Sequence, residues 1–492
     1  MSGVEEYGEA YEVVIVGAGA AGLAAAAALG DHGIATLLVE ERTEPPTLPR
    51  ATVISTRSME LLRAWGLEED TLAGGVDADV WLWECPTLAR AAEGTAHAVG
   101  YPTREQAAVV SPCAPGTVPQ DWLEAVLRRH VGALPATRVE LGTALVGLED
   151  EPDGIRATVQ DCGGRRRDVR AHYLVGADGA HSAVRRLLGV GMEEHAGTYG
   201  GVQVVFRAPL WPVLEDRHYA LYFVTTPDAP GLFLPAGRGD RWVYGPSTPS
   251  EAGEPPGLDP GRLAALIRAG SGIVDLEPVI ERIGPFLSPG EVADRFRVGR
   301  VFLAGDAAHR VTPRGGTGMN TALQSGYDIG WKIAWVLQGW ADPALLETYE
   351  RERRIVAEHN VVRSTDPDGS RRPVVDELNV DLGGRVQHAW LPSASGPRST
   401  LDLLGPGWTL FVGAAATAWE RAVASAAAAV PCTVRRLEPV TARALGLRGD
   451  GALLVRPDGV PVAAWSTVAG LPELRRALAR PGTVPALDLA VA

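Results

Sequence analysis

Cysteine is scarce in this chain of 492 residues, where it occurs four times. The four thiols, Cys85, Cys113, Cys162 and Cys432, are widely scattered along the sequence. This scarcity excludes a disulfide framework and a thiolate zinc site, so we expect isolated free cysteines. The chain also lacks the sequences H-E-x-x-H and G-x-S-x-G and any cluster of metal ligands, which argues against a metal centre and against hydrolytic catalysis.

Positive charge is the second shortage. The chain has 46 Lys and Arg against 60 Asp and Glu, a formal net charge of −14. An acidic surface repels phosphate backbones and anionic lipids, so we expect no nucleic-acid partner.

Long apolar runs are missing as well. No segment reaches the eighteen or more apolar residues that a membrane span needs. The N-terminal apolar stretch follows Glu5, Glu6 and Glu9 and is broken by glycines, unlike a signal peptide. We therefore expect a cytoplasmic protein. Its 492 residues, 46% hydrophobic and 22% charged, have an ordinary globular composition and predict about two to four domains.

Residues 11–40 predict a strand, a glycine turn, a helix and a second strand. Three glycines at positions 17, 19 and 22 form G-x-G-x-x-G directly after the apolar run Val13 to Val16. Gly17 permits the tight turn, Gly19 admits a pyrophosphate to the backbone, and Gly22 lets helix and strand pack closely. Glu40 ends the second strand, where a carboxylate can hold a ribose diol. This context favours dinucleotide binding over an alanine-rich structural helix.

Two further glycine and acid clusters follow. Residues 171–190, AHYLVGADGAHSAVRRLLGV, contain Asp178 after an apolar strand, and residues 300–337 contain Asp306 after another. Open α/β folds bind ligands at the carboxyl ends of strands, where both acids stand. The glycines at 315–318 precede a long helix and predict an anion-binding nest rather than a flexible loop. His309, which lies between Asp306 and these glycines, is expected to be structural.

Together the three motifs resemble the class A flavoprotein monooxygenases, also called aromatic-ring hydroxylases. The resemblance spans about two-thirds of the chain and implies an α/β protein with a Rossmann-like FAD-binding domain, reduced by NADPH or NADH. Asp178 then resembles the family's acid that supports both FAD and the passing nicotinamide nucleotide. One departure is Glu41, which intervenes before Arg42 and leaves the role of that arginine open. Carried over by position, the cofactor-binding residues are Gly17, Gly19, Gly22 and Glu40 on the ADP half, Arg50 and Gln120 near the flavin, Asp178, Asp306 on the ribityl chain, and Gly316, Gly318, Met319 and Asn320 close to the isoalloxazine.

The predicted domains are a discontinuous FAD-binding domain over residues 1–192 and 294–365, and a β-rich substrate domain over residues 193–293. Residues 77–110 have weak periodicity and are predicted to add an irregular segment to the substrate lobe. Alternating apolar segments between 193 and 293 predict a sheet. Its aromatic residues could line the substrate pocket or, as is more common in a sheet, form the core. They are Tyr219, Tyr222, Phe223, Phe233 and Trp242.

The last segment, residues 385–492, resembles the thioredoxin-like tail of family members that act on bulky phenols and polycyclic polyketides. The phrase STLDLLGPGWTL and a predicted hairpin turning at residues 457–459 carry this likeness. Thiol–disulfide chemistry needs two neighbouring thiols, and this segment has only Cys432. We expect a redox-silent domain that packs against the substrate lobe or a second subunit.

The resemblance implies a monooxygenase in which NAD(P)H reduces the flavin and a flavin C4a-hydroperoxide transfers one oxygen to a phenolic or polycyclic aromatic substrate. No protein side chain is assigned as catalytic, because Gly316, Gly318, Met319 and Asn320 would only position the flavin. Baeyer–Villiger or epoxidising oxygen insertion stays open, as does a catalytically silent FAD-binding scaffold. The partners expected are a small aromatic molecule and dioxygen, with the chain a monomer or homodimer.

Overall fold

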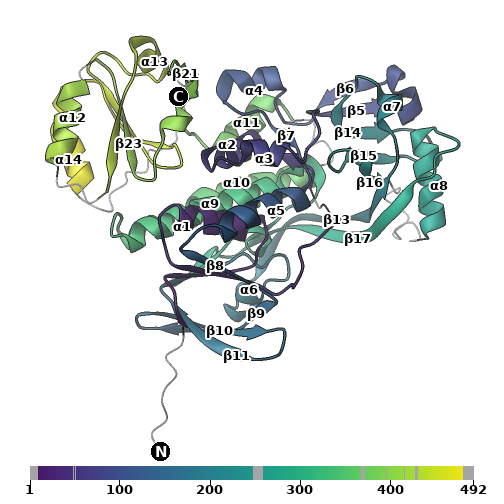
Figure 1. The fold of residues 1–492 in the computed structure, drawn as a ribbon, viewed down its shortest axis with the longest axis horizontal. Coiled ribbons are helices and arrows are strands. Elements are labelled where there is room, and N and C mark those ends of the chain that lie inside the picture. The colour runs from purple at the N-terminus through teal and green to yellow at the C-terminus, as the bar shows by residue number, and fades with distance from the viewer. Residues whose placement is uncertain are drawn as a thin grey trace, which may run out of the picture.

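The computed structural model describes residues 9–47, 49, 51–247, 259–366, 372–394, 396–414, 416–426 and 430–479. A central α/β body lies between a strand-rich lobe and a smaller C-terminal unit (Figure 1). Among the described residues, no helix is long and apolar enough to cross a membrane.

The central sheet brings the three sequence motifs together. Strands β2, β3, β8, β12 and β19 run parallel, and β18 is antiparallel at the edge. Strands β2, β12 and β19 are neighbours, so the loops that follow them meet at one end of the sheet. The prediction of an α/β fold is confirmed. In order, the strands are β18 (Arg297–Val298), β19 (Val301–Leu303), β12 (Tyr173–Gly176), β2 (Val13–Val16), β3 (Thr36–Glu40) and β8 (Thr137–Leu141).

Small residues let two central helices pack closely. Helix α1 (Ala20–Gly30) is mostly alanine, and helix α9 (Gly318–Leu337) crosses it with Gly326 and Gly330 at the contact. A Cβ added at Gly326 would lie 2.0 Å from the carbonyl oxygen of Ala21. The alanine-rich sequence therefore serves to bring α9, and the loop before it, against the nucleotide-binding turn.

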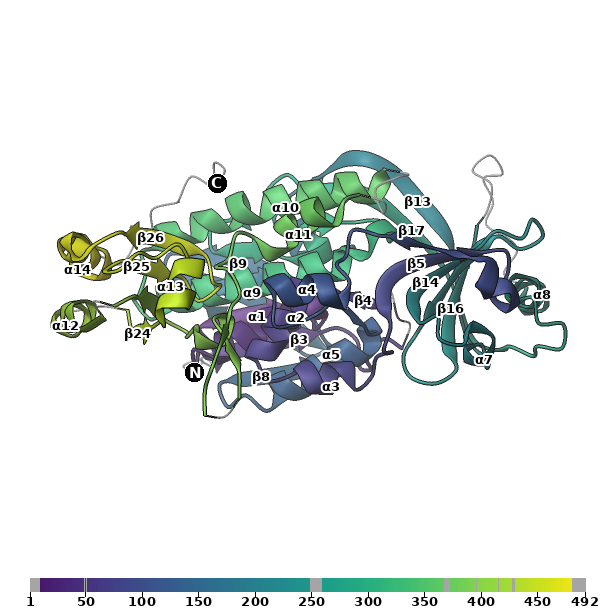
Figure 2. The same cartoon turned by 90° about the horizontal axis from the view of Figure 1, so that it is seen from above.

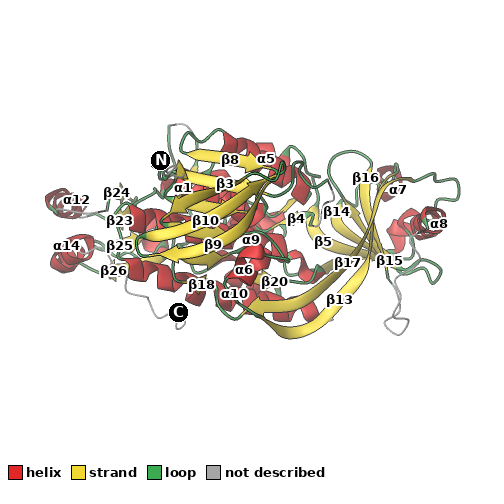
Figure 3. Cartoon of the chain, turned by 90° about the horizontal axis from the view of Figure 1, so that it is seen from below, coloured by secondary structure: helices red, strands yellow, loops and turns green. Residues whose placement is uncertain are grey.

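The connection from β3 to β8 and the segments after β12 supply the remaining helices of the body. A second sheet, of order β1-β11-β10-β9, covers the body on the side shown in Figure 3. These elements are β4 (Val53–Ile54), α2 (Thr56–Ala64), α3 (Glu68–Leu72), α4 (Arg104–Val110), β7 (Gly116–Thr117), α5 (Gln120–Gly132), α6 (Ala183–Leu187), α10 (Glu347–Thr365), α11 (Val374–Leu382), β1 (Glu9–Ala10), β9 (Thr143–Glu151), β10 (Gly154–Asp161) and β11 (Arg166–Ala171).

A long sheet forms the lobe, and its strands β13 and β17 reach back to the central body (Figures 2 and 3). The prediction of an irregular segment over residues 77–110 was wrong, because β5 and β6 join this sheet there. Trp83 of β5 packs against one apolar cluster of the lobe and Leu82 against another, so the near-continuous apolar sequence VWLWEC shows no alternation. The strand order is β20 (His309–Arg310), β17 (Val279–Ala293), β13 (Met192–Arg207), β16 (Arg241–Pro246), β15 (Gly231–Pro235), β14 (Tyr219–Val224), β5 (Asp79–Cys85) and β6 (Thr95–Ala98).

The two faces of this sheet differ. Tyr222, Phe233 and Trp242 are fully buried on the outer face, beneath α7 (Trp211–Leu214) and α8 (Pro260–Ser271). Tyr219 stacks on Trp83 at the same face, with ring centroids 4.9 Å apart. Most of the candidate aromatics are thus core, and Phe223 alternates to the opposite face.

The C-terminal unit has a sheet of order β24-β23-β25-β26, and its described residues pack on the central body. The indole Nε1 of Trp335 on α9 donates to the carbonyl oxygen of Pro406 at 2.9 Å, and its ring meets Trp408. The unit comprises β21 (Trp390–Leu391), β22 (Arg398–Ser399), β23 (Trp408–Val412), α12 (Ala416–Ser425), β24 (Cys432–Arg436), α13 (Pro439–Ala444), β25 (Ala452–Val455), β26 (Pro461–Trp465) and α14 (Leu471–Ala479).

Replacement of Cys432 by serine is expected to leave enzymatic turnover unchanged. Burial raises the pKa of the Cys432 thiol to about 12, so the thiol stays protonated near neutral pH. The side chain packs against the apolar core of the C-terminal unit. Steady-state rates of the parent and the variant, both confirmed folded by circular dichroism, check this. A folded variant with clearly lower turnover would contradict a redox-silent unit.

Candidate functional site

The turn after β2 has the backbone geometry of a phosphate cradle. Gly17 has φ +104°, and a Cβ there would lie 2.3 Å from the carbonyl oxygen of Ala177. A Cβ at Gly22 would lie 1.9 Å from the carbonyl oxygen of Gly17, so α1 can approach the turn only with glycine. At Gly19 the nearest atom to such a Cβ is Glu124 Oε1, at 3.8 Å. The backbone at Gly19 is therefore open to a ligand, at the start of α1.

A groove of about 340 Å³ adjoins this turn. Both oxygens of Glu40 accept backbone N–H groups, Oε2 from Ala18 at 2.8 Å and Oε1 from Arg42 at 3.1 Å. These bonds fix the carboxylate at the groove while lone pairs stay available for a ligand hydroxyl. The groove and the open turn fit the ADP half of FAD. Its walls are Ala18, Gly19, Glu40, Arg42, Glu44, Pro45, Pro46, Glu124, Arg128 and Leu141.

The two residues predicted near the flavin have different outcomes. Gln120 begins α5, where its Nε2 donates to Glu124 Oε1 at 2.7 Å and its backbone N–H donates to Ala51. Arg50 lies outside the described residues. Sequence reasoning missed Glu124, a buried carboxylate facing Gly19, because it resembles any polar residue of an amphipathic helix.

Asp178 holds the second motif in shape. Its Oδ2 accepts the backbone N–H of Val184 at 3.0 Å, and its Oδ1 accepts the hydroxyl of Ser182, which itself caps α6. Arg185 on the same helix donates from Nη1 to the carbonyl oxygen of Ala307 at 3.1 Å. The second motif is thereby tied to the third, next to Asp306, which is half-buried in the turn Gly305–Ala307.

The third motif forms a glycine loop, residues 313–317, at the start of α9. Gly315 and Gly316 have φ of +79° and +63°. Asn320 anchors the loop: its Oδ1 accepts the backbone N–H of Ser55 at 2.8 Å, and its Nδ2 donates to the carbonyl oxygens of Val53 and Gly316. The side chain of Asn320 is thus occupied within the protein. The helix N-terminus beside it, with Gly318 and Met319, offers backbone N–H groups to negative charge.

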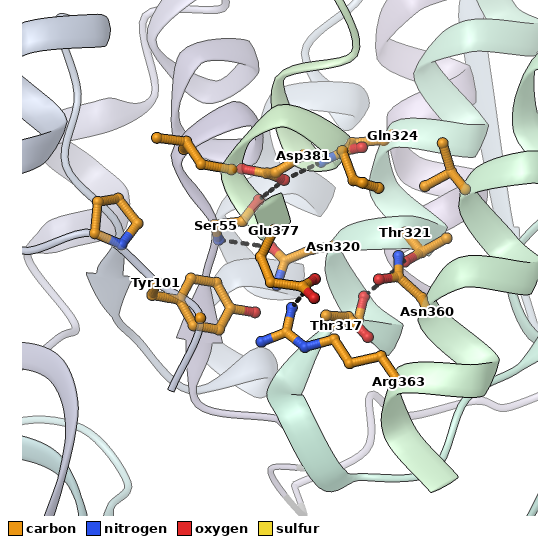
Figure 4. Close-up of a pocket in the computed structure, with 15 residues that line it drawn as sticks. Ser55, Tyr101, Thr317, Asn320, Thr321, Gln324, Asn360, Arg363, Glu377 and Asp381 are labelled. Atoms are coloured by element: carbon orange, nitrogen blue, oxygen red, sulfur yellow. Dashed lines mark hydrogen bonds and ion pairs between the residues drawn. The ribbon is translucent and has the colours of Figure 1, made fainter. Parts of the chain in front are cut away.

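A cavity of about 410 Å³, lined by both apolar and hydrogen-bonding side chains, lies beside the glycine loop (Figure 4). Asp381 accepts Ser55 Oγ at 2.7 Å, Gln324 Nε2 at 2.8 Å and the backbone N–H of Arg57 at 2.9 Å. Burial raises the pKa of Asp381. The cavity is lined by Ser55, Gly100, Tyr101, Pro102, Thr317, Asn320, Thr321, Gln324, Val356, Asn360, Arg363, Glu377, Leu378, Val380 and Asp381.

The inner face of the lobe sheet, opposite α7 and α8, is directed at the central body (Figure 2). Arg241 on this face donates from Nη1 to Asp121 Oδ2 of α5 at 2.9 Å, and Gln203 donates to the carbonyl oxygen of Pro49. Several apolar side chains of this face stay half-exposed, which offers a roof to a flat apolar molecule. They are Leu221, Phe223, Leu232 and Leu234.

His309 is buried behind the glycine loop, with Nε2 3.2 Å from Ser325 Oγ. Burial lowers its pKa from 6.5 to about 3, so the folded protein holds a neutral imidazole. The unfolded chain takes up a proton below its ordinary pKa, so the stability from this group is present above pH 6.5 and is lost as the pH falls toward 3.

Lowering the pH from 7 to 5 is therefore expected to cost about 2 kcal/mol through His309. Urea unfolding of the parent and of His309→Asn at both pH values measures this share, which the variant should lose. Replacement of the exposed His172 by asparagine is the control. An equal pH dependence in the parent and His309→Asn would contradict the assignment.

Two family models match consecutive parts of the chain. Residues 10–364 match the model of an FAD binding domain, and residues 380–481 match the model of the aromatic-ring hydroxylase C-terminal region.

Curated relatives and a solved structure extend over nearly the whole chain. Tetracenomycin B2 monooxygenase-dioxygenase of Streptomyces olivaceus is 34% identical over 95% of this chain and 98% of its own. Aklavinone 12-hydroxylase of Streptomyces purpurascens is 32% identical over 93% and 95%. A crystal structure of aklavinone-11 hydroxylase with FAD and aklavinone matches with a TM-score of 0.84 and 29% identity, over 98% of this chain and all of that one.

Proposed function

Because the chain belongs to the FAD-dependent aromatic-ring hydroxylases and is an FAD-dependent monooxygenase, we propose that it hydroxylates a phenolic, polycyclic aromatic substrate of the polyketide type. NADPH or NADH is the proposed reductant. The observation that carries the substrate class is the half-exposed apolar inner face of the lobe sheet, which is directed at the central body that carries the loops following β2, β12 and β19 (Figure 2).

We propose that the ADP half of FAD lies along the turn at Gly17, Gly19 and Gly22, with its ribose at Glu40. Asp306 would hold the ribityl chain, and residues 316–320 would offer backbone N–H groups to the pyrimidine edge. Bound FAD, once reduced, supplies the chemistry that activates dioxygen. The protein's own share is to bind and orient both molecules and to exclude water.

A flat aromatic ring suits the inner face because four of its half-exposed side chains, Leu221, Phe223, Leu232 and Leu234, are aliphatic or aromatic. Burying a side chain such as Leu232 or Leu234 against a ring contributes about 25 cal/mol per Å² of apolar surface. A phenol of the substrate then supplies electron density for oxygen transfer, and the walls need only hold the reacting carbon in place.

The domain division proposed for this activity is an FAD-binding domain over residues 1–192 and 294–365, a substrate domain over residues 193–293 with a contribution from residues 77–110, and a C-terminal domain over residues 385–492. We infer that the last is thioredoxin-like. Its support is the order β24-β23-β25-β26, in which β23 and β24 are parallel and the other pairs antiparallel.

Turnover tests the proposal against its alternatives. NAD(P)H consumption that depends on an added polycyclic phenol, with a hydroxylated product, supports it. A ring-expanded ester or an epoxide would establish the other oxygen insertions. If the protein binds FAD tightly but no phenol or polyketide stimulates its NAD(P)H consumption, the result would favour a catalytically silent FAD-binding scaffold.

Replacement of Asp306 by alanine is expected to weaken FAD binding by about 1–3 kcal/mol, the usual worth of a hydrogen bond to a charged group. Titration of the apoprotein with FAD, followed by quenching of flavin fluorescence, measures the change. Asp150→Ala, at an exposed position of β9, is the control. Equal affinity of Asp306→Ala and the parent would remove Asp306 from the ribityl site.

A further inference from the structure

A buried arginine lies directly against the glycine loop. Arg363, in the last turn of α10, is 3% exposed. A Cβ added at Gly315 would lie 3.2 Å from Arg363 Nε, and a Cβ at Gly100 would lie 2.3 Å from its Nη2. Both glycines have positive φ, +79° and +80°. Two separate loops therefore leave room for this one guanidinium.

The guanidinium is held in a fixed position (Figure 4). Its Nη1 donates to Glu377 Oε2 at 2.8 Å and its Nη2 donates to the carbonyl oxygen of Val99 at 2.8 Å. The ring of Tyr101 lies 5.7 Å from the guanidinium carbon, and the hydroxyl of Tyr101 donates to the carbonyl oxygen of Gly316. The cation and the glycine loop thus share Tyr101 as a common support.

Glu377 on α11 is the counter-charge. Burial by itself would raise its pKa, but the hydrogen bond with His359 and the charge of Arg363 outweigh burial, so the pKa of Glu377 is lowered. Glu377 is therefore ionised near neutral pH. The glycine loop therefore lies against the positive charge of Arg363. The electric field of that charge at the loop is reduced by the carboxylate of Glu377, which a substitution can remove.

Flavin reduction makes the position of this charge important. Oxidised flavin accepts a hydride, which is two electrons and a proton, from NAD(P)H, and the reduced ring carries negative charge at its pyrimidine end. A fixed cation in a buried, low-dielectric setting stabilises the reduced form more than the oxidised form. A fixed anion does the opposite.

We propose that Arg363, balanced by Glu377, sets the reduction potential of the flavin held at the glycine loop. The inference rests on the proposed FAD site at residues 316–320. Arg363 is a tuning residue that acts through the electric field at the loop, and Glu377 limits its effect. Removal of either charge should therefore move the potential, in opposite directions.

The test is the midpoint potential of bound FAD, measured by equilibration with a redox dye in the holoenzyme. Arg363→Gln should weaken binding of reduced relative to oxidised FAD about tenfold, which lowers the potential by about 30 mV. Glu377→Gln keeps the side-chain shape and should raise the potential. Shifts of the same sign, or none in either variant, would overturn the inference.

Two further variants separate charge from structure. Arg363→Lys keeps the positive charge and should stay closer to the parent potential than Arg363→Gln. Glu352→Gln weakens the ion pairs that Glu352 of α10 forms with Arg456 and Lys332, eleven residues and about 16 Å away along the helix. If the variant stays folded, it should leave the potential unchanged.

If Arg363→Gln fails to retain flavin, the sign of the Glu377→Gln shift decides, and a lower or unchanged potential overturns the inference. A parent protein that binds no FAD would overturn the proposed function itself, which is a distinct result.

Discussion

Gly22→Val is expected to give a folded protein that purifies without yellow colour. A Cβ at this position would lie 1.9 Å from the carbonyl oxygen of Gly17 and 3.1 Å from its carbonyl carbon. Because backbone atoms cannot move aside as a side-chain tip does, α1 must shift away from the turn. The turn and the helix N-terminus then no longer point at the same phosphate.

We expect flavin occupancy to fall at least tenfold, measured from the absorbance of purified protein reconstituted with excess FAD. Gly132→Val in α5 is the matched control, since a Cβ there meets nothing within 4 Å. Circular dichroism separates loss of FAD from loss of fold. Stoichiometric FAD in folded Gly22→Val would contradict the placement of the cofactor at this turn.

Lys332→Met is expected to destabilise the protein by about 3–5 kcal/mol, the cost of leaving buried charges without their partner. Lys332 is fully buried, and its Nζ donates to Asp328 Oδ2 at 2.7 Å and to Glu352 Oε2 at 2.8 Å. Arg456 from the C-terminal unit binds the same Glu352. The cluster therefore joins α9, α10 and the hairpin turn at residues 457–459.

Urea unfolding at neutral pH measures the loss. The double variant Lys332→Met with Asp328→Leu removes one stranded carboxylate and should recover part of the stability. A fall of less than 1 kcal/mol in the free energy of unfolding of Lys332→Met would contradict a stabilising role for this buried cluster of charges. Carboxylate oxygens of Asp328, Glu352 and Asp458 lie within 4.8 Å of one another, but each already forms an ion pair with Lys332 or Arg456, so we expect no metal there.

Local sequence patterns predicted the parts of the fold that depend on neighbouring residues. The strand and glycine turn at residues 13–22 agree with β2 and the start of α1, and the hairpin at residues 457–459 joins β25 to β26. In each case a turn requires particular residue types within a few positions. The sequence also predicts that the three motif loops lie close together, because parallel strands have their carboxyl ends at the same edge of a sheet.

Contacts between distant segments could not be predicted in this way. Tyr101 and Gly316 are 215 positions apart, and Ser55 and Asp381 are 326 apart. Arg363 has the sequence context of a solvated helix residue, and only the space left by Gly100 and Gly315 distinguishes it. The direction of each aromatic in the lobe likewise depends on which sheet face the helices α7 and α8 cover.

The most direct test of the central claim is the origin of the oxygen in the product. The purified protein with FAD and NAD(P)H would be given a polycyclic phenol under isotopically labelled dioxygen, and the product analysed by mass spectrometry. We predict one labelled oxygen atom in a hydroxylated ring and none from labelled water. Oxygen from water, or reduced cofactor consumed with peroxide as the sole product for every aromatic substrate tested, would contradict a monooxygenase.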